Sequence, residues 1–186
     1  MLTRQSIVAV ARDQVEALGF ETVSLRAVAR ELGVTAPALY DHVDSKAELL
    51  ELVAAEGFDE LVKAFAEASL PTAKERLRAR AVAYVSFAAG HPELFRLMFQ
   101  YRPVGVGAEI DNELDAATEA FEASFSDLTQ AISEGELPQR DILELSMMLW
   151  AAIHGVATVA MMVPSAEHEG LAGDVIDAML KGLRPG

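Results

Sequence analysis

Residues 31–50, ELGVTAPALYDHVDSKAELL, constrain the fold most, because they contain the stop and start signals of closely spaced helices. Gly33 follows an apolar periodic segment, at a point where a closing helix needs a left-handed residue that only glycine adopts without steric cost. Thr35 is placed to cap the next helix with its hydroxyl. Pro37 falls in the first turn, where its missing N–H costs nothing. The stretch therefore predicts a helix, a tight turn and a second helix barely two turns long.

The second helix of this stretch can bury only one side. Leu39 and Val43 supply an inward apolar pair, and the remaining side chains are small or carry hydrogen-bonding tips. Ser45 and Glu48 form a capping box for a third helix. Two helices joined by a short glycine turn match the helix-turn-helix, whose second helix enters the major groove of DNA. The alternative interpretation of the same pattern is a plain helical corner.

The wider context of residues 3–50 resembles the DNA-binding domain of the TetR family of one-component repressors. The likeness runs from an amphipathic first helix through GFETVSLRAVARELGVT to ALYDHVDSKAELL, about a quarter of the chain. Leu39 and Tyr40 fall on the family's leucine-tyrosine pair, and Lys46 falls on its phosphate-binding lysine. The resemblance implies an all-α fold, with a three-helix DNA-binding domain at residues 1–46 and a helical ligand-binding and dimerisation domain at residues 47–186.

Seven side chains are expected to face double-stranded DNA. Lys46, at a helix start, suits a phosphate, while Arg26 and the 35–38 turn are better placed for bases. Arg26 also has a plainer interpretation as a solvated helix residue. The full expected set is Arg26, Thr35, Ala36, Ala38, Tyr40, His42 and Lys46.

The net charge of −14 argues against DNA binding, and its distribution decides how strongly. Residues 1–46 carry five basic and six acidic side chains, so most of the negative charge lies in the remainder of the chain. A near-neutral domain binds DNA if its few cations share one face, although its non-specific affinity is then modest.

Composition and the absence of catalytic motifs argue against several other classes of protein. The 52% hydrophobic content supports a substantial core. The absence of cysteine excludes disulfides and thiol chemistry and fits a cytoplasmic protein, as does the amphipathic start of the chain, which lacks a signal-peptide pattern. The four histidines lie in different predicted elements, and no nucleophile elbow, P-loop or dinucleotide motif occurs. We therefore expect no metal, no cofactor and no enzymatic activity.

Apolar periodicity predicts helices throughout the chain, and no strand alternation occurs. A first helix should cover residues 3–18 and end at Gly19, and a second should start after Ser24. The helix from Ser45 should continue into the larger domain. The later predicted helices cover residues 72–88, 94–99, 110–132, 138–163 and 171–183, with a loop at 102–107.

Residues 147–163 contain no formally charged side chain. The segment falls short of the ~20 apolar residues that span a bilayer and has no basic flank, so we expect no membrane insertion. A helix apolar all round is buried all round. We therefore predict a homodimer that pairs residues 138–163 and 175–183 of two copies. The expected interface residues are Ala152, Val156, Val159, Val175, Ile176 and Met179.

Aromatic residues of the larger domain are candidates for a ligand pocket. Trp150 and His154 lie four residues apart on one helix face, and both carry a polar tip that needs a partner. Together with Gly155 they resemble the W…HG signature of one TetR subgroup. The expected lining is Phe95, Phe99, Phe121, Phe125, Trp150 and His154.

The function implied by the resemblance is transcriptional repression relieved by a small, largely apolar effector. The alternative is a helical enzyme or small-molecule carrier that does not bind DNA.

Overall fold

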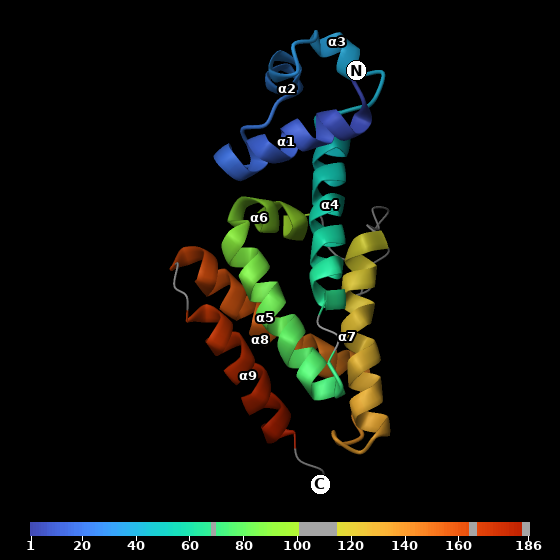
Figure 1. The fold of residues 1–186 in the computed structure, drawn as a ribbon, viewed down its shortest axis with the longest axis vertical. Helices are drawn as coiled ribbons and strands as arrows, with labels where there is room; N and C mark the ends of the chain where they lie inside the picture. The colour runs from blue at the N-terminus through green and yellow to red at the C-terminus, as the bar shows by residue number, and fades with distance from the viewer. Residues whose placement is uncertain (68–69, 101–114, 164–166, 184–186) are drawn as a thin grey trace. The chain divides into compact units, whose positions relative to one another are not determined.

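The computed structural model describes residues 1–67, 70–100, 115–163 and 167–183, and its regular structure within these ranges is entirely helical. The predicted all-α fold is confirmed. The chain divides into two compact units, one of residues 1–59 and 91–117 and the other of residues 60–90 and 118–186. Figure 1 labels the helices of both units in chain order.

The first unit combines the N-terminal helices with a later one. In it α1 packs against α2 and α6, and α2 packs against α3. Its core includes Ile7, Val28, Leu39, Leu49 and Phe95, each at most 1% exposed. The helices are α1 (Arg4–Leu18), α2 (Leu25–Glu31), α3 (Ala36–Leu39), the first part of α4 (Lys46–Glu67) and α6 (Pro92–Gln100).

The ends of α1 and α2 follow the predicted signals. The Ser24 hydroxyl accepts a hydrogen bond from the Ala27 backbone N–H at 3.2 Å, which caps α2. Gly19 and Gly33 have φ angles of 80° and 68°, the left-handed values that favour glycine. Both glycines therefore end their helices as expected. Thr3 caps α1, so that helix begins at Arg4.

Two local details in this unit differ from the prediction. The helix α3 has only four residues, and the Thr35 hydroxyl makes no capping bond; the Thr35 carbonyl instead accepts from the Ala38 N–H at 3.0 Å. A one-turn helix held by such short-range bonds leaves the hydroxyl unused for capping. The Ser45 hydroxyl does accept from the Glu48 N–H at 3.1 Å, but the Glu48 carboxylate accepts from the Asp44 N–H and so only half of the predicted capping box forms.

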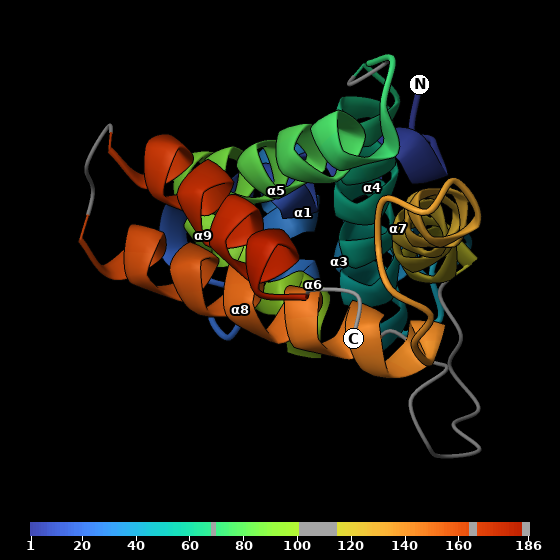
Figure 2. The ribbon, with the colours of Figure 1, turned by 90° about the horizontal axis from the view of Figure 1, so that it is seen from below.

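The second unit is built around three helices that lie side by side, α5, α8 and α9 (Figures 1 and 2). The Thr72–Glu75 capping box that starts α5 is confirmed, and the hydrogen bond from the Thr72 hydroxyl lowers the pKa of the Glu75 carboxyl. The bounds are α5 (Ala73–Gly90), α7 (Asp115–Ser133), α8 (Ile142–Met162) and α9 (His168–Gly182).

The helix α8 starts later than expected, at Ile142 and not at residue 138, because the Asp141 carboxylate caps it by accepting from the Glu144 N–H at 2.9 Å. Among the described helices, α8 is the one long and apolar enough to meet a length and composition test for crossing a membrane. It packs one face against α5 and α9 and leaves exposed residues on the other. The predicted 102–107 loop, Pro164 and the start of the predicted 110–132 helix lie outside the described residues.

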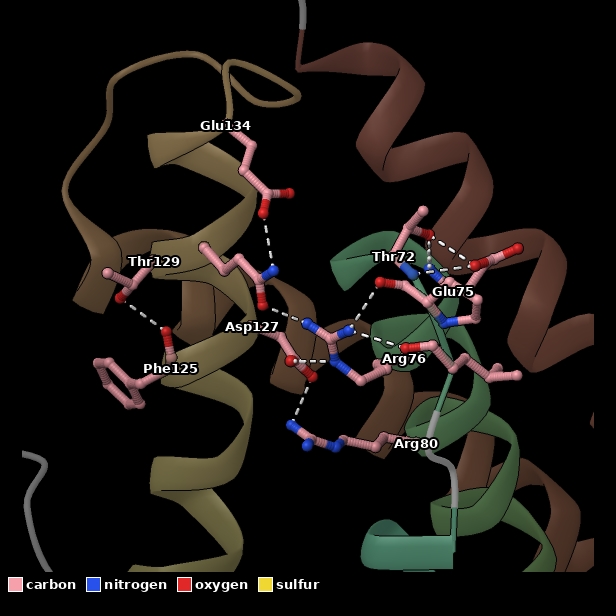
Figure 3. Close-up of polar contacts among 11 residues, drawn as sticks. Thr72, Glu75, Arg76, Arg80, Phe125, Asp127, Thr129 and Glu134 are labelled. Carbon is pink, nitrogen blue, oxygen red and sulfur yellow. Dashed lines mark hydrogen bonds and ion pairs between the residues drawn. The ribbon is translucent and has the colours of Figure 1, made fainter.

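A charged cluster joins α5 to α7 (Figure 3). The Asp127 side chain is 4% exposed and accepts from Arg76 Nε at 2.7 Å, while Arg80 Nη1 lies 2.6 Å from its other oxygen. Arg76 also donates to the Leu70 carbonyl at 2.8 Å. Burial lowers the pKa of the Arg80 guanidinium, and the neighbouring Asp127 opposes that shift. The sequence pattern did not predict this cluster.

Candidate functional site

The two helices of the predicted helix-turn-helix pack against each other in the first unit. Val28 and Ala29 of α2 are buried together with Leu39 of α3, at 0%, 2% and 0% exposure. Ala29 has no side chain beyond Cβ, so it permits a close approach of the helices. The buried Val43 fixes the chain that follows α3. The inward apolar pair predicted at Leu39 and Val43 is confirmed.

The residues predicted to face DNA lie at or near the ends of these elements. Arg26 is the second residue of α2 and is exposed, as is Thr35 immediately before α3. Tyr40, directly after α3, is 56% exposed, which is unusual for a large aromatic side chain. Ala36, Ala38, His42 and Lys46 are partly exposed. The set thus retains solvent-facing surface around the turn and α3.

Lys46 is the first residue of α4. Its Nζ donates a hydrogen bond to the Glu21 backbone carbonyl at 2.9 Å, which anchors the cation beside the segment leading into α2. The arrangement holds a positive charge next to the helix-turn-helix and leaves two of its three N–H donors for other acceptors.

The pocket candidates fall in both units. Phe95 and Phe99 belong to the first unit, where their ring centroids are 4.7 Å apart and Phe99 packs edge-on to Phe58 at 5.7 Å. Phe125 is a partly buried residue of α7 in the second unit. The Phe121 side chain lies outside the described part of the structure.

Trp150 and His154 of α8 converge on Tyr84 of α5, a partner that helical spacing does not predict. Trp150 Nε1 donates to the Tyr84 hydroxyl at 3.3 Å, and that hydroxyl lies 2.8 Å from His154 Nδ1. The Trp150 and His154 rings are 5.3 Å apart. Burial raises the pKa of Tyr84, which is 6% exposed, and lowers the pKa of the half-buried His154. The three side chains form a neutral polar triad.

The triad was only partly predictable. The four-residue spacing of Trp150 and His154 placed them on one face, but Tyr84 lies 70 residues from His154 along the chain. A buried tyrosine needs a hydrogen-bond partner for its hydroxyl. That general requirement was the available signal, and it does not specify the partner.

The residues predicted for dimerisation differ in exposure within a single chain. Val156 and Ile176 are buried at 8% and 3%, whereas Val159 is 47% exposed. Ala152, Val175 and Met179 are intermediate. Between residues 148 and 162 the exposed side chains of α8 carry no formal charge, and they include Met148, Ala151, Gly155, Val159 and Met162; we call these five residues the α8 outer stripe.

Metal binding has no support in the described residues, which contain no group of three or more histidine or acidic side chains able to hold an ion.

Comparison with known proteins assigns the chain to a family. The model described as "Bacterial regulatory proteins, tetR family" matches residues 7–53, and "Tetracyclin repressor-like, C-terminal domain" matches residues 77–183, more than half of the chain. An uncharacterized HTH-type transcriptional regulator of Mycobacterium tuberculosis is 28% identical over 161 residues, which cover 86% of this chain and 71% of that protein.

Solved structures share the fold of this chain. A Rhodococcus sp. RHA1 protein of unknown function is 30% identical, covers 97% of this chain and 94% of its own, and has a TM-score of 0.84. The fold also matches the regulator FadR of Bacillus subtilis in complex with stearoyl-CoA, at 18% identity, 97% and 99% coverage and a TM-score of 0.77. The chain belongs to the TetR family, whose members are helix-turn-helix, DNA-binding transcriptional regulators.

Proposed function

We propose that this protein is a homodimeric transcriptional repressor, released from its operator by a small and largely apolar effector. The observation that carries the proposal is the α2–turn–α3 arrangement, in which the buried Val28, Ala29 and Leu39 leave Thr35 and Tyr40 exposed beside the turn. Hydroxyl groups and small side chains on a short second helix suit the edges of base pairs in the major groove. A soluble regulator of this kind acts in the cytoplasm.

The proposed dimer brings two helix-turn-helix units together, one from each chain. A single chain leaves the α8 outer stripe exposed and uncharged. Its small residues Ala151 and Gly155 permit close approach of a second helix, and twofold pairing would cover both copies at once. Specific binding then needs the second helices of the two helix-turn-helix units to lie about 34 to 36 Å apart, which is one turn of the duplex.

Release by an effector needs only a difference in affinity between two states of the dimer. We place the effector in the larger domain, near Trp150 and His154. There it would favour a dimer in which the two helix-turn-helix units have a different spacing. The helix α4 would transmit this change. The polar triad supports a mostly apolar ligand held by few hydrogen bonds. The W…HG pattern is compatible with such a site, and so is the stearoyl-CoA that the Bacillus subtilis FadR binds.

Operator binding is tested by a gel shift with the promoter region of the protein's own gene. Lys46→Ala should weaken binding to all sequences and reduce the slope of log K against log salt by about one, because one phosphate contact is lost. Lys63→Ala removes an exposed cation from the same helix outside the proposed interface and serves as the control. Equal slopes for the wild type and Lys46→Ala would remove Lys46 from the interface.

The effector site is tested with Trp150→Ala in the same assay. The variant should retain operator affinity and lose response to whichever compound releases the wild type. Trp150 is the only tryptophan in the chain, so its fluorescence reports binding directly in the wild-type protein. A folded, dimeric Trp150→Ala that responds with unchanged affinity would place the pocket elsewhere.

The alternative of a helical enzyme or carrier without DNA binding predicts no specific shift in this assay. The match of residues 7–53 to the DNA-binding family model weighs against it, and regulators of this family are generally not enzymes.

A further inference from the structure

We infer that Arg30 is a further DNA contact of this protein, and that its guanidinium group binds a phosphate one helical turn away from Arg26. The sequence pattern did not place Arg30 among the residues that face DNA. The inference deepens the proposed function and rests on DNA binding by the helix-turn-helix.

The first unit holds most of its cations through internal contacts. Lys46 donates to a backbone carbonyl. Three arginines lie within ion-pair distance of a glutamate: Arg4, Arg12 and Arg96, which pair with Glu48, Glu16 and Glu93 respectively. The exceptions are Arg26 and Arg30 of α2. Both side chains are exposed, and neither has an ion-pair or hydrogen-bond partner in the part of the chain that the structure describes.

The sequence of α2 explains why these two charges stay unpaired. Neither arginine has an acidic residue three or four positions away, where a helix would place an ion-pair partner. Arg26 and Arg30 are instead four positions from each other, and like charges at that spacing destabilise a helix. The helix dipole favours a cation in the last turn, where Arg30 lies, but disfavours one in the first turn, where Arg26 lies. Helix stability therefore accounts for at most one of the pair.

Both guanidinium groups belong to the same flank of α2. Residues four apart are only about 40° apart around a helix axis. Glu31 lies about 100° from Arg30 and belongs to another flank, where its carboxylate accepts from Gln14 Nε2 of α1 at 2.8 Å. The buried Val28 and Ala29 form the core side of the helix. The arginine flank is therefore exposed, positively charged and separate from the contact with α1.

The chemistry of this flank fits the DNA backbone. Guanidinium groups bind phosphate oxygens through charge-assisted hydrogen bonds. In a helix-turn-helix the first of the two helices crosses the backbone while the second enters the groove, and α2 is that first helix. Arg30 lies one turn, about 6 Å along the axis, from Arg26, which is expected at base edges. We therefore assign Arg30 to a phosphate beside the bases that Arg26 reads.

The test measures the salt dependence of DNA binding by the full-length protein. Fluorescence anisotropy is recorded with a duplex from the promoter region of the protein's own gene and with a shuffled duplex of the same composition. Arg30→Gln removes the charge and keeps a long side chain with good helix propensity. The slope of log K against log salt should fall by about one on both duplexes. Between about 50 and 200 mM salt, the wild type should then lose about three- to fourfold more affinity than the variant.

Two further variants separate charge from geometry and from general electrostatics. Arg30→Lys should keep the wild-type slope, because a phosphate contact needs a point charge and not the planar fork of arginine. Arg96→Gln removes the same charge from an exposed arginine of the same unit that already pairs with Glu93. Its slope should equal that of the wild type.

An unchanged slope for Arg30→Gln, or an equal fall for Arg96→Gln, would overturn the inference. A lower melting temperature with an unchanged slope would assign Arg30 to the stability of α2 alone. Weakening confined to the promoter duplex would make Arg30 a residue that reads bases, which contradicts the phosphate assignment. If the wild type binds neither duplex, both the inference and the proposed function fail. Equal wild-type binding to both duplexes with the predicted slopes would support the Arg30 contact and tell against sequence-specific repression.

Discussion

At the level of single residues, Asp127 is a buried carboxylate of the second unit that pairs with two arginine side chains. Two guanidinium groups, Arg76 and Arg80, share its carboxylate, and their side chains are only 17% and 16% exposed. Arginine remains protonated in proteins, so these charges cannot be relieved by proton loss. The carboxylate therefore offsets one of the two positive charges and reduces the repulsion between the guanidinium groups.

Removing this charge should be costly. Asp127→Asn keeps the size of the side chain but leaves two largely buried cations without their carboxylate, so we expect the free energy of unfolding to fall by about 3 kcal/mol, measured by urea denaturation.

Asp177→Asn is the matched control, because the Arg78–Asp177 pair is 45% exposed on both sides with its atoms 3.4 Å apart. That change should alter stability by less than about 1 kcal/mol. Similar losses in the two variants would show that burial of the Asp127 cluster does not set its contribution.

At the level of helices, local signals predicted most of the fold. Ser24 and Thr72 start helices where their hydroxyls cap backbone N–H groups, and Gly19 and Gly33 end helices with positive φ. These signals join residues no more than four positions apart, so they can be recognised in the amino-acid sequence. The start of α8 differs from the prediction because the Asp141 carboxylate, and not Pro138, defines the first turn of the helix.

Contacts between helices that are far apart in the chain could not be predicted from the sequence in this way. Tyr84 meets His154 across 70 residues, and Arg76 meets Asp127 across 51. Helical periodicity indicates which face of a helix is buried but not which residue of another helix it meets. The candidate site was therefore predicted as positions on separate helices, and Tyr84 was absent from it.

The contact between α4 and α6 in the first unit yields a prediction at this level. A Cβ atom added at Gly57 would lie 2.7 Å from Met98 Sδ and 3.3 Å from Leu94 Cδ1. Both neighbours are fully buried, so they have little room to move. Gly57→Ala should therefore reduce the free energy of unfolding by about 1 to 3 kcal/mol despite the higher helix propensity of alanine.

Gly170→Ala is the control for that experiment, because nothing lies within 4 Å of its added Cβ. Its helix α9 should be stabilised by up to about 1 kcal/mol. Thermal unfolding of both variants separates the steric effect from helix propensity, and a stabilised Gly57→Ala would contradict close packing of α4 on α6.

For the whole molecule, the distribution of charge is consistent with DNA binding by the helix-turn-helix and dimerisation by the larger domain. The first 46 residues are nearly neutral, and most of the net charge of −14 belongs to the rest of the chain. An acidic surface repels DNA, so it favours contact through the near-neutral helix-turn-helix. It also makes two copies repel each other unless they meet through an uncharged surface, which the α8 outer stripe offers.

Dimerisation through this stripe can be tested by placing a charge in it. Val159 is 47% exposed in a single chain, so Val159→Glu should be tolerated by the fold but should bury an unpaired carboxylate in the proposed dimer. Light scattering at micromolar concentration should then show monomers, and operator affinity should fall because the two half-sites are no longer bound as one unit. Leu70→Glu introduces the same charge at a 41% exposed site between α4 and α5 and should leave a dimer. A wild-type monomer, or a Val159→Glu dimer as stable as the control, would exclude this surface from the interface.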